Sequence, residues 1–196
     1  MLTVEGLIGE RNGLRLWGPL DFALRAGDAV HLRGPNGGGK TTLLRTLAGL
    51  RPALAGQVRH QAGCAFLGHQ DGWAEDLDSL CNLKLFAELH GADAGQASAL
   101  TEELAIPSRA VRHLSAGQRR KLALARLKLV RRALWLLDEP FDSLDDAACQ
   151  WLCQLAQQHV AGGGAVVLSS HQQLPQEFPQ CRSLRLGTDA SQQVPA

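Results

Sequence analysis

A glycine-rich segment early in the chain has the residue types and spacing of a phosphate-binding loop. It consists of Gly34, Pro35, Asn36, Gly37, Gly38, Gly39, Lys40 and Thr41, and it matches the pattern G-x-x-x-x-G-K-T. Glycines let successive backbone N–H groups turn inward around phosphate oxygens, and a helix starting at Lys40 would direct its positive end at the same charge. We expect Lys40 to reach the β- and γ-phosphates of ATP and the Thr41 hydroxyl to bind Mg²⁺, and we include Thr42 among the nucleotide-binding residues.

A pair of acidic residues follows a wholly apolar stretch in the second half of the chain. The stretch at 134–137 reads Leu-Trp-Leu-Leu, and Asp138 and Glu139 come directly after it. Such a run is typical of a buried strand, which would present both carboxylates at its C-terminal end. Asp138 would hold Mg²⁺ through water, and Glu139 would polarise the water that attacks the γ-phosphate. Acidic residues also commonly cap helices, so the pair alone is a weak signal. We assign it to catalysis because the same chain contains the glycine-rich loop.

A third segment, Leu114-Ser115-Ala116-Gly117-Gln118, precedes a basic helical stretch. Ser115 can cap that helix while Gln118 reaches back to close a capping box. This arrangement would leave a helix N-terminus and the small residue Gly117 free to approach a phosphate, so we assign Ser115 and Gly117 to nucleotide binding. The alternative is a well-capped helix without a ligand.

These residues must be held by an alternation of strands and helices. Strands are expected at 2–5, 14–17, 29–33, 56–60, 63–67, 134–137, 165–169 and 183–186, and helices at 40–48 and after 144. This alternation predicts a largely parallel sheet flanked by helices. From 79 to 104 the pattern is helical without a strand, so we interpret 76–130 as an inserted helical subdomain between core segments 1–75 and 131–186. The polar tail at 187–196 is expected to fray.

The composition fits one globular domain. The chain has 196 residues, 45% of them hydrophobic and 20% charged, which suffices for one sizeable core and excludes a disordered or fibrous protein. The net charge of +1 gives no support for nucleic-acid binding. No apolar stretch approaches the ~20 residues that a membrane-spanning helix requires, and the first residues lack the pattern of a secretory signal. We therefore expect a cytosolic protein with no membrane span of its own.

Taken in order, these motifs resemble those of the ATPase domains of ABC transporters, with Ala116 where glycine is more usual. Gln70 after a strand resembles the Q-loop glutamine, residues 143–145 resemble the D-loop, and His171 after a strand resembles the switch histidine. The resemblance implies a P-loop NTPase fold of the ABC type with an antiparallel N-terminal β region. It also implies that Gln70 lies near Mg²⁺ and His171 near the γ-phosphate. The catalytic residues implied are Lys40, Gln70, Glu139 and His171.

The resemblance further implies the partners of the chain. ABC ATPases work as homodimers, in which ATP lies between the P-loop of one copy and the Ser115–Gly117 region of the other. Integral membrane permease subunits would be separate chains, because this sequence has no span. A short cytoplasmic helix of such a permease would dock in the groove between Gln70 and the 114–118 segment.

Three short stretches resemble one subgroup of the family. Residues 66–70, 114–120 and 137–145 are similar to the ATP-binding subunit of the bacterial cytochrome c maturation, or haem export, system. This implies attachment to the cytoplasmic side of the inner membrane through integral partners, and hydrolysis that powers haem export or releases a haem-loaded chaperone. The alternatives are the ATPase subunit of another ABC importer or exporter, and a soluble ABC ATPase that acts on ribosomes or DNA.

One position departs from the family pattern. ABC ATPases usually stack an aromatic side chain on adenine from a loop near the N-terminus, yet that position falls near Arg11 and the chain has no tyrosine. Arg11 could stack through its guanidinium plane, and Trp17 is the nearest aromatic residue. Adenine and guanine nucleotides therefore both stay open as ligands.

Overall fold

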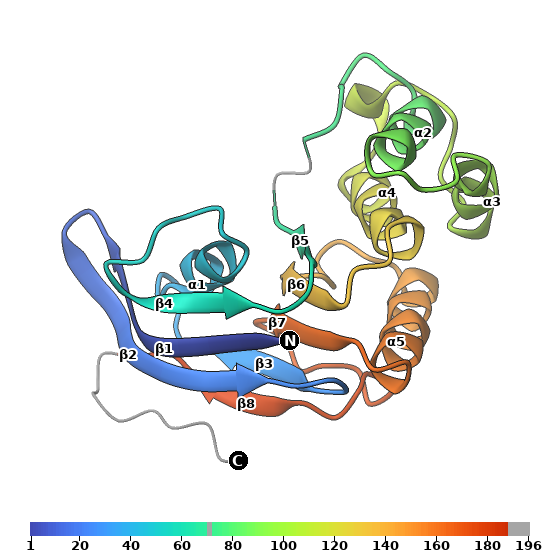
Figure 1. Ribbon diagram of the computed structural model, residues 1–196. Coiled ribbons are helices and arrows are strands. Elements are labelled where there is room, and N and C mark those ends of the chain that lie inside the picture. Colours follow the sequence, from blue (N-terminus) through green and yellow to red (C-terminus); the bar gives the residue numbers. More distant parts are fainter. Residues whose placement is uncertain (70–71, 188–196) are drawn as a thin grey trace.

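The computed structural model describes residues 1–69 and 72–187, which form two sheets and a group of helices (Figure 1). One sheet is antiparallel with the order β2-β1-β4, and the other is parallel with the order β5-β6-β7-β3-β8. The antiparallel strands are β1 (Leu2–Arg11), β2 (Leu14–Leu24) and β4 (Ala55–His60). The parallel strands are β3 (Ala29–Arg33), β5 (Cys64–Leu67), β6 (Leu134–Asp138), β7 (Ala165–Ser169) and β8 (Arg182–Arg185). The predicted parallel core sheet with an antiparallel N-terminal β region is confirmed.

The N-terminal hairpin is longer than the sequence pattern predicts. β1 and β2 are joined by Asn12 and Gly13, which both have positive φ angles, 53° and 76°. An Asn-Gly pair with such angles is the preferred two-residue turn of a hairpin. The alternation expected of β2 breaks at Gly18-Pro19, which is why the predicted strand stops at residue 17. The strand continues because β2 lies at the edge of its sheet, where proline is tolerated.

The parallel sheet is covered on both faces. Leu134 and Leu136 of β6 pack into a cluster with β1, β2 and helix α1 (Lys40–Leu47), so α1 fills the space between the two sheets. Trp135 and Leu137 point to the other face, where α4 (Ala116–Leu129) and α5 (Asp146–Ala161) cover them. Because both faces are buried, every residue of the central strands β6 and β7 is buried and most are apolar, without alternation.

The middle of the chain, residues 76–130, is helical, as predicted. It contains α2 (Ser79–Leu89), α3 (Gln96–Glu103), the 3-10 turn η1 (Val111–His113) and α4. Figure 1 shows α2 and α3 standing apart from the sheets beside one end of α4. Leu122 of α4 packs into a hydrophobic cluster with residues of α2 and α3. Leu124, two residues later, packs against the parallel sheet. Helix α4 therefore joins the two packing clusters, while the subdomain boundaries at 75 and 131 stay a prediction.

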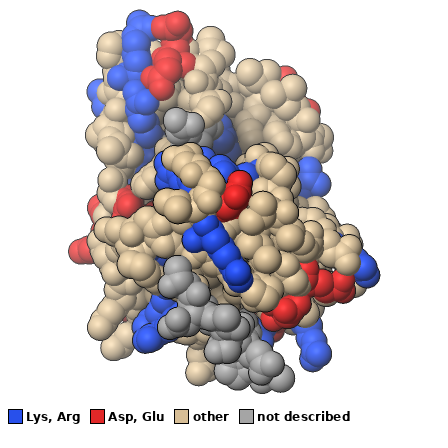
Figure 2. Space-filling view, turned by 90° about the vertical axis from the view of Figure 1, so that its left-hand side faces the viewer, with Lys and Arg blue, Asp and Glu red and all other residues tan. Residues whose placement is uncertain are grey.

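The length and apolarity of the helices, and the charge on one face, bear on membrane and nucleic-acid binding by the described residues. None of the helices within residues 1–69 and 72–187 has the length and apolarity needed to cross a bilayer. Figure 2 shows the side from which the β1–β2 hairpin projects, and there basic and acidic side chains are interspersed among uncharged ones. On this face the described residues form no continuous basic surface.

Candidate active site

The glycine-rich loop joins the end of β3 to the start of α1, and its shape depends on Gly39. Gly39 is the N-cap of α1 and has a φ of 88°, a left-handed conformation. A Cβ at this position would lie 2.6 Å from Nε1 of Trp17, so glycine is required here for two reasons. The Trp17 indole is buried, and its N–H donates to the carbonyl oxygen of Gly39 at 3.2 Å. The indole therefore supports the loop from the protein interior.

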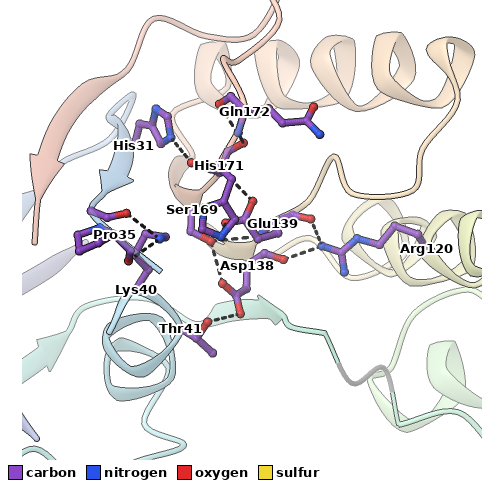
Figure 3. Close-up of polar contacts among 12 residues, drawn as sticks. His31, Pro35, Lys40, Thr41, Arg120, Asp138, Glu139, Ser169, His171 and Gln172 are labelled. Atoms are coloured by element: carbon purple, nitrogen blue, oxygen red, sulfur yellow. Dashed lines mark hydrogen bonds and ion pairs between the residues drawn. The ribbon is translucent and has the colours of Figure 1, made fainter. Parts of the chain in front are cut away.

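Lys40 is folded back onto the same loop (Figure 3). Its Nζ donates to the carbonyl oxygens of Gly34 at 2.9 Å and Pro35 at 3.2 Å. The N–H of Gly38 also donates to the Pro35 oxygen, at 3.0 Å, and this hydrogen bond closes a turn within the loop. The ammonium group lies at the N-terminal, positive end of α1. The charge of the ammonium group and the partial positive charge of the helix N-terminus together favour an anion in front of them.

Thr41 and Asp138 meet although 97 residues separate them in the sequence. The Thr41 hydroxyl donates to Oδ2 of Asp138 at 2.8 Å. Ser169, at the end of β7, donates to Oδ1 of the same carboxylate at 2.7 Å and accepts the N–H of Glu139 at 3.1 Å. A hydroxyl and a carboxylate side by side are the oxygen ligands that Mg²⁺ prefers. The donor set therefore fits the magnesium position that the sequence predicts.

Glu139 is buried and faces His171. Its Oε2 accepts the backbone N–H of His171 at 2.9 Å, and its Oε1 lies 3.3 Å from Nε2 of the same histidine. Oε1 is fully buried and accepts no hydrogen bond of acceptable geometry from the described residues. A buried carboxylate oxygen without a donor is unusual and is suited to accept a proton.

These groups surround one cavity of about 200 Å³. Its lining residues are Arg11, Asn36, Gly37, Gly38, Gly39, Lys40, Thr41, His69, Glu139 and His171. Of the other predicted residues, Asp138 contacts Thr41, and Gly34 and Pro35 contact Lys40. Thr42 is buried in α1 and does not line the cavity. Gln70 lies outside the described residues, as does nearly all of the tail.

Ser115 and Gly117 are not among the residues that line this cavity. The predicted capping box at the start of α4 is confirmed, because Gln118 N–H donates to Ser115 Oγ at 3.2 Å and Ser115 N–H donates to Gln118 Oε1 at 3.0 Å. A Cβ on Gly117 would lie 2.6 Å from the carbonyl oxygen of Ser143. The glycine therefore lets the helix N-terminus pack against the 143–145 loop, and the hydroxyl-bearing Ser115 stays exposed.

The two candidates for stacking on the base differ in accessibility. Trp17 is 1% exposed and is enclosed by the glycine-rich loop on one side and Gly9 on the other. A base cannot reach it, so the alternative in which Trp17 stacks is excluded. Arg11 is exposed at the end of β1 and lines the cavity, so its guanidinium plane is available.

Four residues around the site are not assigned a role there by the sequence pattern. Ser169 ends an apolar strand just as Asp138 does. This shared position is a signal that could have identified Ser169 as a site residue. His69 lines the cavity, although its position suggests only the end of a strand. His31 and Arg120 are polar residues at positions that the pattern treats as ordinary strand and helix. Both are buried beside backbone groups of the site.

His31 in β3 supports the loop that carries His171. One ring nitrogen, Nε2, lies 3.3 Å from the carbonyl oxygen of Ser170, and Nδ1 accepts the Nε–H of Arg33 at 3.3 Å. With Nδ1 as acceptor, Nε2 carries the proton and donates to Ser170. Burial lowers the pKa of His31, the charges of Arg33 and Lys40 lower it further, and the Ser170 carbonyl opposes the shift. The ring is therefore neutral in the folded protein at neutral pH.

This lowered pKa predicts a loss of stability in mild acid. Because the unfolded state binds a proton to His31 near pH 6.5 and the folded state does so only at lower pH, folding becomes less favourable as the pH falls below 6.5. We expect the melting temperature to drop between pH 7.5 and 5.5, by roughly 2–4 °C for each kcal/mol lost. His31→Gln should reduce this drop, whereas replacing the exposed His60 should not. An unchanged pH slope in His31→Gln would contradict the assignment. His159, whose pKa burial also lowers, accounts for part of the remaining slope.

A second cavity, of about 560 Å³, lacks the groups needed for phosphate chemistry. Lys128, Arg131, Arg132, Trp135 and His159 contribute to its lining. Among the described residues that surround it, none belongs to the glycine-rich loop and none is a carboxylate. The smaller cavity is therefore the one whose lining matches the site residues predicted from the sequence.

Known protein sequences resemble this chain over most of its length. The model of a family described as ABC transporter matches residues 18–142. The cytochrome c biogenesis ATP-binding export protein CcmA of Rhodobacter capsulatus is 44% identical over 173 residues, covering 87% of this chain and 81% of that protein. The protein of the same name from Dechloromonas aromatica is 39% identical and covers 95% and 100%, respectively. The similarity therefore extends over most of this chain and over most of each of these two relatives.

Solved structures share the fold. A dimeric ATP-binding cassette in a post-hydrolysis state, bound to ADP and phosphate, has a TM-score of 0.82 at 20% identity, with 95% of this chain and 94% of that chain covered. An ATP-binding subunit of an ABC transporter has a TM-score of 0.82 at 25% identity, with coverages of 95% and 85%. The two sheets and the helical segment thus form a known arrangement.

Proposed function

The chain belongs to the ABC transporter family of ATPases, within it to the cytochrome c biogenesis ATP-binding export proteins, and we propose from this membership that it powers haem export or the release of a haem-loaded chaperone. The observation that supports ATP hydrolysis most directly is the convergence of Lys40, Thr41, Glu139 and His171 on one cavity. These residues follow β3, β6 and β7, whose carboxyl ends meet at one edge of the parallel sheet. Ligands of open α/β sheets bind at this edge.

The triphosphate binds in front of α1. Backbone N–H groups of the glycine-rich loop and the Lys40 ammonium hold the β- and γ-phosphates, and the dipole of α1 adds to their attraction. Lys40 already lies at the cavity, where it donates to the Gly34 and Pro35 carbonyls. A phosphate oxygen is a better acceptor for this cation than a neutral carbonyl.

Thr41 would ligate Mg²⁺ directly and Asp138 would hold it through water, with Gln70 as a further ligand from the family pattern. When bound, the metal would neutralise negative charge on the phosphate oxygens. Ser169 orients the Asp138 carboxylate by its hydrogen bond to Oδ1, so the other oxygen, Oδ2, stays directed at Thr41. Residues that orient a ligand in this way contribute to metal affinity.

Glu139 is the general base. As the oxygen of a water molecule attacks the γ-phosphorus, the bond to the β–γ bridging oxygen breaks, ADP leaves, and the proton of the water passes to Oε1 of Glu139. That oxygen is buried and without a hydrogen bond from the described residues. The backbone N–H of His171 holds the carboxylate by its other oxygen, Oε2. The His171 ring is about half exposed at the cavity, so its Nε2–H can donate to a γ-phosphate oxygen.

The working unit is a homodimer. Ser115 and Gly117 do not line the cavity of their own chain, yet Ser115 is exposed at a capped helix N-terminus, which attracts phosphate. We assign this end of α4 to the γ-phosphate bound by the partner copy. Each of the two ATP sites is then completed by residues from both protomers.

Integral permease subunits anchor this dimer at the cytoplasmic side of the inner membrane. Affinity purification of the tagged chain from membranes, followed by identification of the bound proteins, tests this proposal. We expect integral subunits of a cytochrome-assembly complex and ATPase activity that depends on Lys40. Purification with ribosomes or DNA, or with an unrelated permease, would contradict it.

Arg11 predicts weak discrimination between bases. A guanidinium plane stacks on any base without reading its edge, so ATP and GTP should bind within about tenfold of each other. Arg11→Ala should weaken both nucleotides, whereas Arg59→Ala, which removes an exposed charge from β4 of the same sheet, should weaken neither. Competition of each nucleotide with a fluorescent analogue measures these affinities. A strong preference of the wild type for ATP would show that another group reads the base.

A further inference from the structure

Arg120 places a positive charge in the interior, next to the catalytic edge of the sheet. It is 6% exposed, and within the described residues its guanidinium group donates to four backbone carbonyl oxygens. Nη1 donates to Gly68 at 2.8 Å, Nη2 to Asp138 and Glu139 at 2.7 Å each, and Nε to Pro140 at 3.4 Å. Figure 3 shows the side chain reaching from α4 to the carbonyls of Asp138 and Glu139. Burial of a guanidinium is unfavourable unless its donors are satisfied in this way.

The contacts of Arg120 join three separate segments. Gly68 follows β5 and is two residues before Gln70 in the sequence, whereas Asp138 ends β6 and Glu139 and Pro140 follow it. Arg120 itself belongs to α4, the helix whose N-terminus is Ser115. The guanidinium is a planar fork with five N–H donors at fixed directions. One side chain therefore fixes the spacing between α4 and the ends of two strands.

The backbone of Glu139 has a conformation that needs such support. Its φ is 48°, in the left-handed region that residues with long side chains rarely adopt. The carbonyls of Glu139 and of both its neighbours accept from Arg120. These three bonds hold the turn that directs the Glu139 carboxylate at His171. Arg120 thus acts on the carboxylate through the main chain and does not touch the cavity itself.

We propose that Arg120 is a positioning residue, which holds the Glu139 carboxylate in its working orientation and ties that orientation to the position of α4. The proposal rests on the proposed function, in which Glu139 is the general base and α4 meets the nucleotide of the partner. A shift of α4 relative to the sheet moves the guanidinium and with it the carbonyl of Glu139. A buried anchor that only stabilised α4 would have no such effect on the proton-accepting group.

Arg120→Lys tests this assignment, because lysine keeps the charge but cannot bond the four carbonyls with one fork. In the purified complex we expect kcat to fall by about 10- to 100-fold while the KM for ATP changes by less than about twofold. Arg119→Lys is the matched control, since Arg119 is the preceding residue of the same helix and pairs with Glu75 at the surface. It should leave kcat unchanged. Arg120→Gln, with a planar amide in place of the fork, gives the same test if the lysine variant does not fold.

The decisive measurement repeats Arg120→Lys in a Glu139→Gln background under single-turnover conditions. If Arg120 acts through Glu139, the second substitution lowers the residual rate by less than about twofold. An equal loss in both backgrounds, or an unchanged kcat in Arg120→Lys alone, would overturn the proposal. Full turnover by Glu139→Gln alone would instead show that the proposed role of Glu139 has failed, so the two failures are distinguishable.

Discussion

Glu139→Gln is expected to bind ATP as well as the wild type does but to hydrolyse it at least ~10²-fold more slowly, the scale of a lost general base. The side chain is buried at the cavity, and one of its oxygens, Oε1, has no hydrogen bond from the described residues. A glutamine amide has the same shape but cannot take the proton of the attacking water. Binding should persist because the amides of the glycine-rich loop and Lys40 lie on the other side of the cavity.

The measurement is phosphate release by the purified complex, together with the affinity for ATP in the absence of turnover. Glu177→Gln serves as a matched control, because Glu177 is exposed and does not line the cavity. It should retain full activity. Unchanged turnover by the Glu139 variant would remove the general-base assignment, and loss of binding would show that Glu139 holds the nucleotide instead.

Ser115→Arg is expected to abolish hydrolysis while each chain still binds ATP at its own glycine-rich loop. Ser115 is exposed at the N-terminus of α4 and lies outside the cavity of its own chain. A long side chain at this point would keep the helix N-terminus away from the γ-phosphate of the partner. Because the substitution acts on the interface, it should also weaken dimer formation by Glu139→Gln in the presence of ATP when both protomers carry it, measured by light scattering.

A control separates this effect from a loss of helix stability. Replacing an N-cap serine by a residue that cannot cap costs ~1 kcal/mol, whereas asparagine caps about as well as serine. Ser115→Asn should therefore fold like the wild type and retain a substantial part of the activity. If Ser115→Arg is folded at the assay temperature and still hydrolyses ATP normally, the helix N-terminus has no role in the reaction.

The residues of the phosphate site could be predicted because their chemistry dictates short patterns. A lysine and a threonine after a glycine run, and two acids after a buried strand, need only local sequence to be identified. That Thr41 and Asp138 contact each other also follows from the fold, since parallel strands bring their carboxyl ends to one edge. The capping box of Ser115 and Gln118 is local as well, and it is confirmed.

Other features depend on contacts that no local pattern encodes. Nothing in the sequence around Arg120 indicates that its side chain turns inward to bind carbonyls at the ends of β5 and β6, because an arginine in a basic stretch is usually exposed. The burial of Trp17 depends on Gly39, 22 residues later in the chain. The role of His31 requires β3 and β7 to be neighbours. In each case tertiary packing decides where the side chain lies.

The most direct test of the shared ATP site compares two mixed dimers with the same two substitutions in different arrangements. In the first, one protomer has Ser115→Arg and the other has Glu139→Gln, so both changes affect the same composite site and the other site is intact. In the second, one protomer has both changes and its partner is wild type, so each site is damaged once. Our account predicts substantial ATPase activity in the first dimer and none in the second. A second dimer as active as the first, or more active, would contradict it.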